Sequence, residues 1–424
     1  MSELVIRGGT VVDARGSRRA DVVVADGRVV AVGEDLTADE IVDAGGCVVA
    51  PGLVDLHCHL RQPGQEEAET VETGSRAGSL GGYTALVAMP NTTPAIDSAA
   101  MVHEVLDLGR SALCDIHVAG AITIGREGEK LAPIGEMTAL GVRLFTDDGR
   151  GVQDARLMRR AMEYASDLDV ILAQHCEDEA IAQGGAMHEG EWSSRLGLPG
   201  QPPEAEELMV QRDLALARLT GARVHFQHLS TAGSIAMVRA ARAAGLPVTA
   251  EATTHHFTLT HAACAGYDPV FKVNPPLRTE EDRKAVKSGL ADGALDAIAT
   301  DHAPHAPHLK ELPFDQAPPG MLGLQTALAL ALTELDLPIE RVLALMAWCP
   351  ARIAGLGDQH GGPIEPGAPA HLCVIDPAHE WVVDPGALAS RARNTPYAGR
   401  RLRGKVRHTV LGGELVVRDG EALR

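Results

Sequence analysis

The chain has 424 residues, of which 45% are hydrophobic and 22% charged, and this composition excludes a disordered or fibrous protein. Its formal net charge of -19 argues against nucleic acid or an anionic membrane as a partner, although Arg, His and metal ions in one pocket can still bind a small anion. The seven cysteines include no CxxC pair, the first seven residues show no export signal, and no apolar run of about 18 residues occurs, so we expect a cytoplasmic protein with buried thiols.

Short apolar strands are predicted at both ends of the chain. The expected N-terminal strands are residues 4–7, 9–13, 21–25, 28–32 and 47–50, and the expected C-terminal strands are 371–375, 408–411 and 414–417. Turn residues such as Asp26 and Gly27 separate them. Neither end is large enough to bury a core alone. We therefore expect residues 1–50 and 361–424 to form one small β-domain together.

Residues 51–360 alternate apolar strands with helical patterns. The eight expected strands are 52–59, 83–90, 115–122, 141–148, 169–176, 223–230, 247–254 and 295–301, and helical patterns include 66–78, 154–166, 205–220 and 234–244. The alternation favours a parallel sheet, and eight strands favour a (β/α)8 barrel, whose dependence on a metal is inferred below from the residues at its strand ends. The alternative, an open doubly wound sheet, is disfavoured because no glycine-rich phosphate loop follows the first strand.

Ionisable side chains follow the predicted strands where each strand ends. His57 and His59 end the first strand, and they project together, with Arg61 beyond them, because alternate residues of a strand share a face. The other ionisable residues at strand ends are Asp147, Asp148, His175, His228 and Asp301. The carboxyl ends of barrel strands meet at one mouth, where active sites lie.

Four histidines and two aspartates at one mouth predict a binuclear metal site. The expected ligands of one ion are His57, His59 and Asp301, those of the other are His175 and His228, and the bridge is either Asp147 or Asp148. Nitrogen and oxygen donors without Cys favour Zn²⁺ and also allow Mn²⁺ or Co²⁺.

Seven short sequence segments, spread in order through the barrel region, match the motifs of one known family. They are DLHCHLRQPG at 55–64, AMPNT at 88–92, FTDDG at 145–149, HCED at 175–178, GAMHEG at 185–190, KVNPPLR at 272–278 and TDHAPH at 300–305. Together with the two-part β-domain, they resemble class I bacterial dihydroorotase of the amidohydrolase superfamily. Many relatives, hydantoinases and allantoinases among them, carry a carboxylated Lys on strand four. Here residues 141–145 contain no Lys, which fits the class I pattern and weakens the hydantoinase interpretation.

The resemblance implies the reversible cyclisation of N-carbamoyl-L-aspartate to L-dihydroorotate, a step of de novo pyrimidine synthesis, by metal-activated hydroxide with Asp301 as general acid and base. The implied ligands of one or two Zn²⁺ per subunit are His57, His59, Asp148, His175, His228 and Asp301. The implied substrate contacts are His59, Arg61, Asn91, Asn274, His305, Pro319 and Gly320. The resemblance also implies a homodimer and allows a complex with aspartate transcarbamoylase.

Two other functions remain open. One is another cyclic amidohydrolase, an allantoinase or hydantoinase; Arg61 with Asn91 favours dihydroorotase, since simple hydantoins carry no carboxylate at the matching position. The other is a non-catalytic scaffold for aspartate transcarbamoylase, but such relatives typically lack the metal ligands, and none of the six is missing here. Residues 303–319 are rich in proline and are expected to form a mobile loop over the site.

Overall fold

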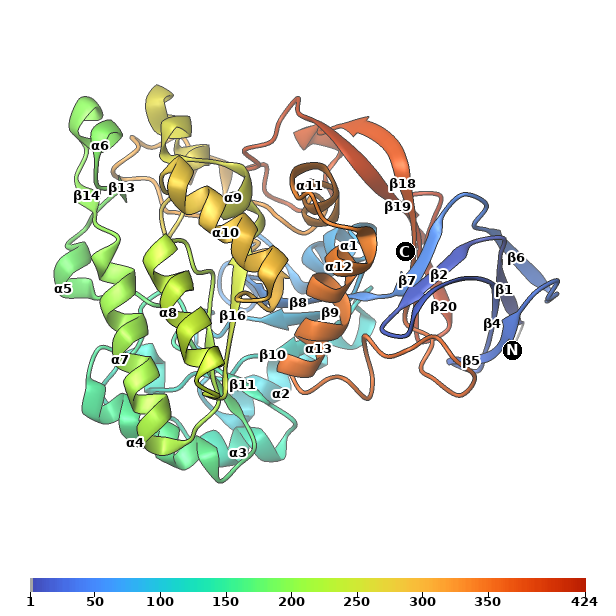
Figure 1. Ribbon diagram of the computed structural model, residues 1–424, viewed down its shortest axis with the longest axis horizontal. Coiled ribbons are helices and arrows are strands. Elements are labelled where there is room, and N and C mark those ends of the chain that lie inside the picture. Colours follow the sequence, from blue (N-terminus) through green and yellow to red (C-terminus); the bar gives the residue numbers. More distant parts are fainter. Residues whose placement is uncertain (1–2) are drawn as a thin grey trace.

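Eight parallel strands form a ring within residues 3–424, the part of the chain that this computed structural model describes (Figure 1). Two ladders, β8 to β10 and β11 to β17, are joined by parallel bridges from Gly120 to Phe145 and from Cys58 to His302. The strands are β8 (Leu53–Cys58), β9 (Tyr83–Ala88), β10 (Asp115–Val118), β11 (Leu144–Phe145), β12 (Ile171–Gln174), β15 (Val224–Phe226), β16 (Val248–Thr253) and β17 (Ala297–Ala299). The predicted (β/α)8 barrel is confirmed, and each strand lies inside its predicted range. Met1 and Ser2, which begin the segment expected to carry no export signal, lie outside the described residues.

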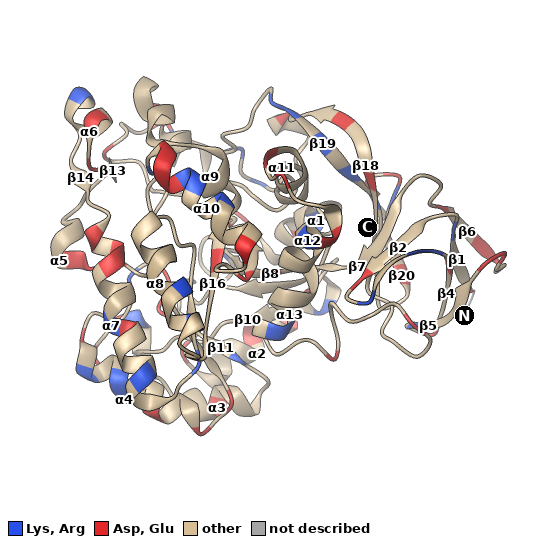
Figure 2. Ribbon diagram, viewed as in Figure 1, with Lys and Arg blue, Asp and Glu red and all other residues tan. Residues whose placement is uncertain are grey.

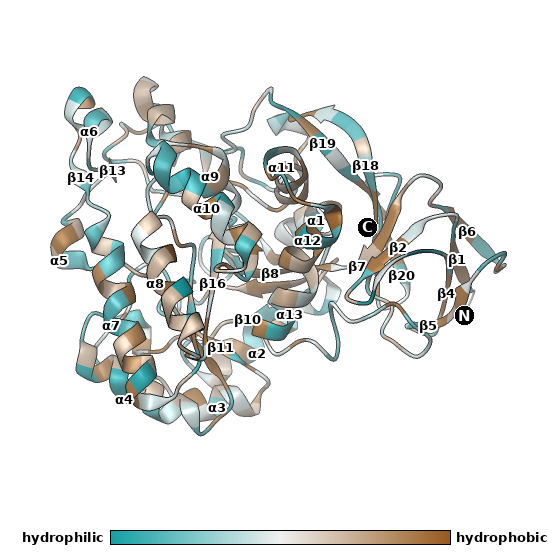
Figure 3. Ribbon diagram, viewed as in Figure 1, coloured by the Kyte–Doolittle hydropathy of each residue, from teal (hydrophilic) through white to brown (hydrophobic). Residues whose placement is uncertain are grey.

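Helices surround the ring because its strands are apolar on both faces. Hydrophobic colour marks β8 inside the barrel in Figure 3, while Figure 2 shows charged residues on α4, α7 and α10 outside it. The main helices are α1 (Val71–Leu80), α2 (Ala99–Leu108), α3 (Ile134–Ala139), α4 (Ala155–Ser166), α7 (Glu204–Thr220), α8 (Ala232–Ala243), α10 (Glu280–Asp292), α11 (Ala327–Glu334), α12 (Ile339–Leu343) and α13 (Cys349–Ile353). Helix α1 begins later than predicted, because the Thr70 side chain accepts the Thr73 N–H and caps it there.

Smaller elements extend the barrel at its carboxyl end. They are α5 (Glu179–Ala182), α6 (Glu191–Leu196), α9 (Thr254–Thr258), β13 (Met187–His188) and β14 (Gly200–Gln201). Among the residues from 3 onward, the structure contains no helix that is both long and apolar enough to cross a membrane.

The two ends of the chain pair in a second, smaller β-structure. Its sheets have the orders β5-β4-β1-β6 and β21-β20-β19-β18-β7-β2-β3, and β18 lies antiparallel to β7 with Leu372 opposite Pro51. The strands are β1 (Leu4–Arg7), β2 (Thr10–Asp13), β3 (Gly16–Arg19), β4 (Asp21–Ala25), β5 (Arg28–Gly33), β6 (Glu40–Asp43), β7 (Val48–Pro51), β18 (Leu372–Val382), β19 (Arg401–Leu411), β20 (Glu414–Arg418) and β21 (Glu421–Ala422). Strands β3, β6 and β21 were not predicted, since β3 is polar, β6 has only two apolar residues and β21 is two residues long.

The loop of the β18–β19 hairpin, residues 383–400, returns to the barrel. There the side chain of Ser390 donates to Glu69, and the Arg391 N–H donates to the same carboxylate at 3.1 Å. Asn394 is buried and donates through Nδ2 to the carbonyl of Ala303 at 3.0 Å. This hairpin therefore reaches the loop that follows β17, close to the carboxyl ends of the strands.

Candidate metal centre

The six expected ligands lie together at the carboxyl ends of the barrel strands. Each is buried, and none is more than 6% exposed. They lie in the last residues of β8 or just after β8, β11, β12, β15 and β17, and they are His57, His59, Asp148, His175, His228 and Asp301. His228 and Asp301 adopt positive φ angles of 33° and 45°, as does Arg61 at 61°. This conformation is costly for non-glycine residues, and three of the ten that adopt it within residues 3–424 lie at this site.

One half of the cluster is built from His57, His59 and two carboxylates. His57 Nε2 lies 3.3 Å from Asp148 Oδ1 and 3.6 Å from Asp301 Oδ1. His59 Nε2 lies 3.0 Å from Asp301 Oδ1 and 3.7 Å from Asp148 Oδ2. Two donors that each lie ~2.1 Å from one tetrahedral ion are separated by about 3.4 Å. The four side chains thus have the spacing of ligands that share an ion.

The other half is built from His175 and His228. His175 Nδ1 and His228 Nε2 are 2.9 Å apart, and each lies 3.6 Å from Asp148 Oδ1. The Asp148 carboxylate therefore lies between both pairs of histidines, in the position that a bridging ligand would take.

The neighbouring carboxylate, Asp147, points elsewhere. It accepts the backbone N–H groups of Ile122 at 2.8 Å and Thr123 at 3.0 Å, and it also accepts the Thr123 hydroxyl. These bonds anchor the segment after β10. Of the two candidates that the sequence left open, the structure brings only Asp148 to the histidines.

Two side chains contact His57 and His59 on the side away from the cluster and fix their orientation. His57 Nδ1 lies 3.1 Å from Glu251 Oε1, and His59 Nδ1 lies 2.9 Å from Asn91 Oδ1. A proton on each Nδ1 leaves the Nε2 lone pair directed at the cluster, which is the usual arrangement behind metal-binding histidines. Glu251, fully buried on β16, was not predicted as a site residue. Its signal in the sequence is a single Glu inside an apolar strand that ends at the barrel mouth.

The carboxylates of the site remain ionised at neutral pH. Burial alone would raise the pKa of Glu251, but hydrogen bonds from His225 and His57 lower this pKa to about 2. Burial likewise opposes ionisation of Asp301, yet the hydrogen bond from His59 and the charge of His57 hold its pKa below the usual range. Buried carboxylates stabilised by several imidazoles are typical of a metal or catalytic centre.

A cavity of about 180 Å³ opens beside the cluster. Besides five of the six expected ligands, all but His57, its lining includes Arg61, Asn91, Asn274, His305, Pro319 and Gly320. The structure therefore brings every expected substrate contact to one cavity. Gly320 has φ 145°, and a Cβ there would lie 2.7 Å from His305 Nε2, so only glycine allows this close approach.

The segment 303–319, expected to be mobile, is tied down by several hydrogen bonds. Lys310 Nζ donates to the carbonyls of Pro269 at 3.0 Å and Pro318 at 2.8 Å. The side chain of His305 donates to the Pro319 carbonyl at 2.8 Å. These bonds hold both ends of the segment in this structure, and its mobility stays a prediction.

The chain is similar to known proteins along nearly its whole length. A family described as "Dihydro-orotase-like" matches residues 46–234. A dihydroorotase of Pelotomaculum thermopropionicum is 46% identical over 98% of this chain and 99% of its own length. A dihydroorotase of Streptomyces coelicolor is 48% identical over 99% of this chain and 100% of its own. L-Hydantoinase (dihydropyrimidinase) from Arthrobacter aurescens has a TM-score of 0.88 at 24% identity, covering 100% of this chain and 98% of that chain, and shares the fold.

Proposed function

This chain belongs to the dihydroorotase family, and we propose that its barrel mouth catalyses the reversible cyclisation of N-carbamoyl-L-aspartate to L-dihydroorotate. The observation that carries the proposal is the convergence of six buried His and Asp side chains beside a cavity that also contains Arg61. The full-length relatives named dihydroorotase support the same reaction. It is a step of pyrimidine synthesis.

The donor set fits one or two divalent ions, and we propose Zn²⁺. Four imidazoles and two carboxylates, without a thiolate, are donors that zinc accepts. His57 Nε2 is buried and has no hydrogen-bond partner within residues 3–424, although Asp148 Oδ1 lies 3.3 Å away. An unpaired buried nitrogen costs about 1–3 kcal/mol, and coordination to an ion would remove this cost. In this proposal Asp148 bridges the two pairs of histidines.

Bound ions of this kind polarise a carbonyl group and lower the pKa of water. Asp301 supplies the proton transfer. In the hydrolytic direction its carboxylate takes the proton of the attacking water and delivers it to the leaving ring nitrogen. In the synthetic direction the same carboxylate accepts the ureido proton and delivers it to the oxygen that leaves as water. Its lowered pKa keeps Asp301 ready to accept a proton at neutral pH.

Arg61 is proposed to bind the substrate carboxylate. Its Nε donates to the Pro304 carbonyl at 3.0 Å, which fixes the guanidinium and leaves the two terminal nitrogens free for a bidentate pair. Burial lowers the pKa of Arg61 to about 10, so the group stays charged at neutral pH. Asn91, Asn274 and His305 complete the proposed contacts, with the backbone of Pro319 and Gly320.

Hydantoinase and allantoinase activity remain the enzymatic alternatives, and a scaffold for aspartate transcarbamoylase is the non-catalytic one. Simple hydantoins give Arg61 no carboxylate to bind, so they are expected to be poor substrates. The homodimer, the aspartate transcarbamoylase complex and a cytoplasmic location stay predictions, and light scattering of the purified protein checks the first of them.

The adjacent aspartates offer a matched experiment on the ligand set. Asp148→Asn is expected to lose bound zinc and turnover of dihydroorotate, because it removes the proposed bridge. Asp147→Asn makes the same chemical change one residue away and is expected to keep its zinc content. Measurement of the zinc content of both folded variants tests the proposed ligand set. A zinc content that falls equally in both, or in neither, would contradict the proposed ligands.

A further inference from the structure

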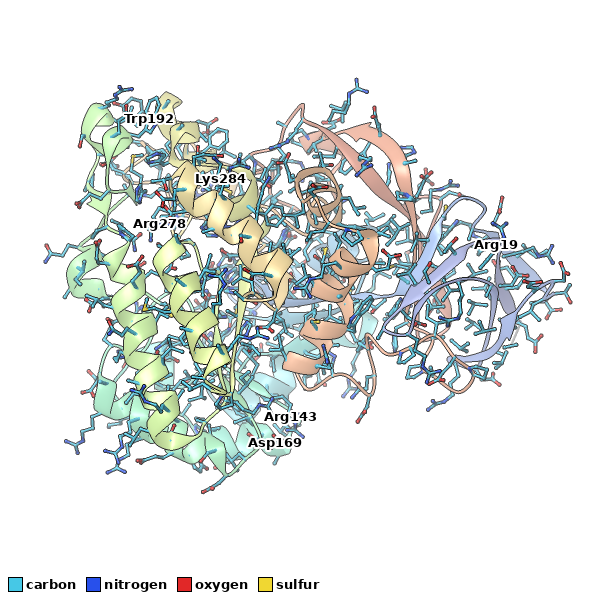
Figure 4. All side chains as sticks on the ribbon, viewed as in Figure 1. Arg19, Arg143, Asp169, Trp192, Arg278 and Lys284 are labelled. Carbon is cyan, nitrogen blue, oxygen red and sulfur yellow. The ribbon has the colours of Figure 1, made fainter. Side chains whose placement is uncertain are left out.

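A second group of metal-binding side chains lies at the amino end of the barrel, opposite the mouth. Asp115 begins β10, His360 lies in the loop after α13, and His371 directly precedes β18. One donor atom from each lies within 4.8 Å of the others. Figure 4 labels Arg143 and Asp169, which lead into β11 and β12 at this same end. The Asp115 cluster, as we name Asp115, His360 and His371, lies where the barrel meets the β-domain.

His360 carries the strongest sign that something is bound there. The residue is 1% exposed, and its Nε2 has no hydrogen-bond partner in the described part of the chain. Asp115 Oδ2 lies only 3.0 Å from that nitrogen, but outside hydrogen-bonding geometry. His57 Nε2 shows the same combination at 3.3 Å from Asp148. A distance of 3.0 Å is an ion-pair contact when the imidazole is protonated, and it is also the spacing of two side chains that ligate one ion.

The remaining contacts direct the imidazoles toward the carboxylate. Thr84, fully buried on β9, lies with its hydroxyl 3.2 Å from His360 Nδ1. A proton on Nδ1 directed at this hydroxyl leaves the Nε2 lone pair facing Asp115. His371 Nε2 lies 3.9 Å from the same carboxylate oxygen. The rings of His360 and His371 have centroids 4.2 Å apart, compared with 4.6 Å for His175 and His228 at the mouth.

We propose that Asp115, His360 and His371 bind a divalent cation of the Zn²⁺ type that links the barrel to the β-domain. Two imidazoles and one carboxylate are common zinc donors, and water or a further side chain completes the tetrahedron. His117 adjoins the cluster, with its ring 5.8 Å from that of His360 and a buried Nε2 that has no partner in residues 3–424. It is the nearest candidate for the fourth position.

Coordination requires one local change. The Gly412 N–H donates to His371 Nδ1 at 3.2 Å, whereas a ring bound through Nε2 carries a proton on Nδ1. Gly412 is exposed in the turn between β19 and β20, so water can take over this hydrogen bond. Coordination of His371 therefore costs only one weak hydrogen bond at the surface.

The test is the number of zinc ions bound per chain after dialysis of the full-length protein against Zn²⁺ alone. We compare the wild type with His360→Gln and His371→Asn, and with His103→Gln as the matched control. His103 is exposed on α2, away from both clusters. Turnover of dihydroorotate, measured on the same samples, reports separately on the mouth of the barrel. His371 is only partly buried, so its variant keeps the test valid if His360→Gln fails to fold.

The expected result is a loss of one zinc per chain in His360→Gln and His371→Asn, with wild-type turnover and with no loss in His103→Gln. Zinc is also expected to raise the Tm of the wild type more than that of His371→Asn, because a ligand that binds only the folded state stabilises it. Equal zinc content in the wild type and in folded His371→Asn would overturn the proposal. Failure of the dihydroorotase proposal would appear instead as absent turnover in all four proteins.

Discussion

Replacement of Glu251 by Gln is the sharpest test of how the metal centre is supported. Glu251 Oε1 lies 3.1 Å from His57 Nδ1, and Oε2 lies 3.1 Å from His225 Nε2, both fully buried. The substitution keeps the shape of the side chain and removes the negative charge that fixes the orientation of the His57 ring. Loss of such a partner behind a ligand typically weakens metal binding 10- to 100-fold, which corresponds to about 1.4–2.7 kcal/mol. We expect zinc affinity to fall within this range.

The assay is competition between the protein and a chelator for zinc, followed by turnover at saturating zinc. Asp213→Asn is the matched control, because Asp213 is equally buried but accepts from Gln174 and Arg212 rather than from a histidine of the cluster. Turnover of Glu251→Gln should recover in part when zinc is added, while Asp213→Asn should show the same zinc dependence as the wild type. A folded Glu251→Gln protein with wild-type zinc affinity would refute the reasoning.

Other predictions concern the loop over the site. Asn394→Ala removes three hydrogen bonds, to Ala303, His305 and Gly320, and should lower the free energy of unfolding by about 2–3 kcal/mol in denaturant titrations while raising KM for dihydroorotate at unchanged zinc content. Burial and the charge of Lys272 lower the pKa of Lys310 to about 7. The unfolded chain therefore binds more protons above pH 7, and the wild type should gain stability over Lys310→Met by at most about 1.4 kcal/mol per pH unit from pH 7 to 10. A difference in unfolding free energy between the wild type and Lys310→Met that does not vary with pH would contradict the lowered pKa of Lys310.

Much of the site could be predicted because strand ends of a parallel barrel meet at one mouth. His57, His59, His175, His228 and Asp301 were each placed at such an end from the apolar pattern alone, and the structure brings them together. The same pattern predicted all eight barrel strands. These are local signals, since each depends on one short run of residues.

What could not be predicted depends on contacts between distant segments. Asp147 and Asp148 are chemically identical neighbours, and only the hydrogen bonds of Asp147 to Ile122 and Thr123 show which one faces the histidines. Glu251 looks like an ordinary charge in its own strand until His57, 194 residues away, is seen beside it.

The hydrogen bonds that hold the loop over the site could not be predicted for a similar reason. Its prolines indicate mobility, which stays a prediction, whereas Lys310 and Asn394 contact it through the carbonyls of Pro269 and Ala303. Neither tether has a signature in the sequence, because each forms through the backbone carbonyls of residues that the fold alone brings near.

The most direct test of the central claim is turnover in both directions by zinc-loaded protein. Loss of dihydroorotate and its formation from N-carbamoyl-L-aspartate are followed, with allantoin and hydantoin as control substrates and Asp301→Asn as the variant. We expect turnover of dihydroorotate alone, lost in both directions in zinc-loaded Asp301→Asn. Preferred turnover of hydantoin or allantoin, or no turnover of any substrate by zinc-loaded wild type, would contradict the account.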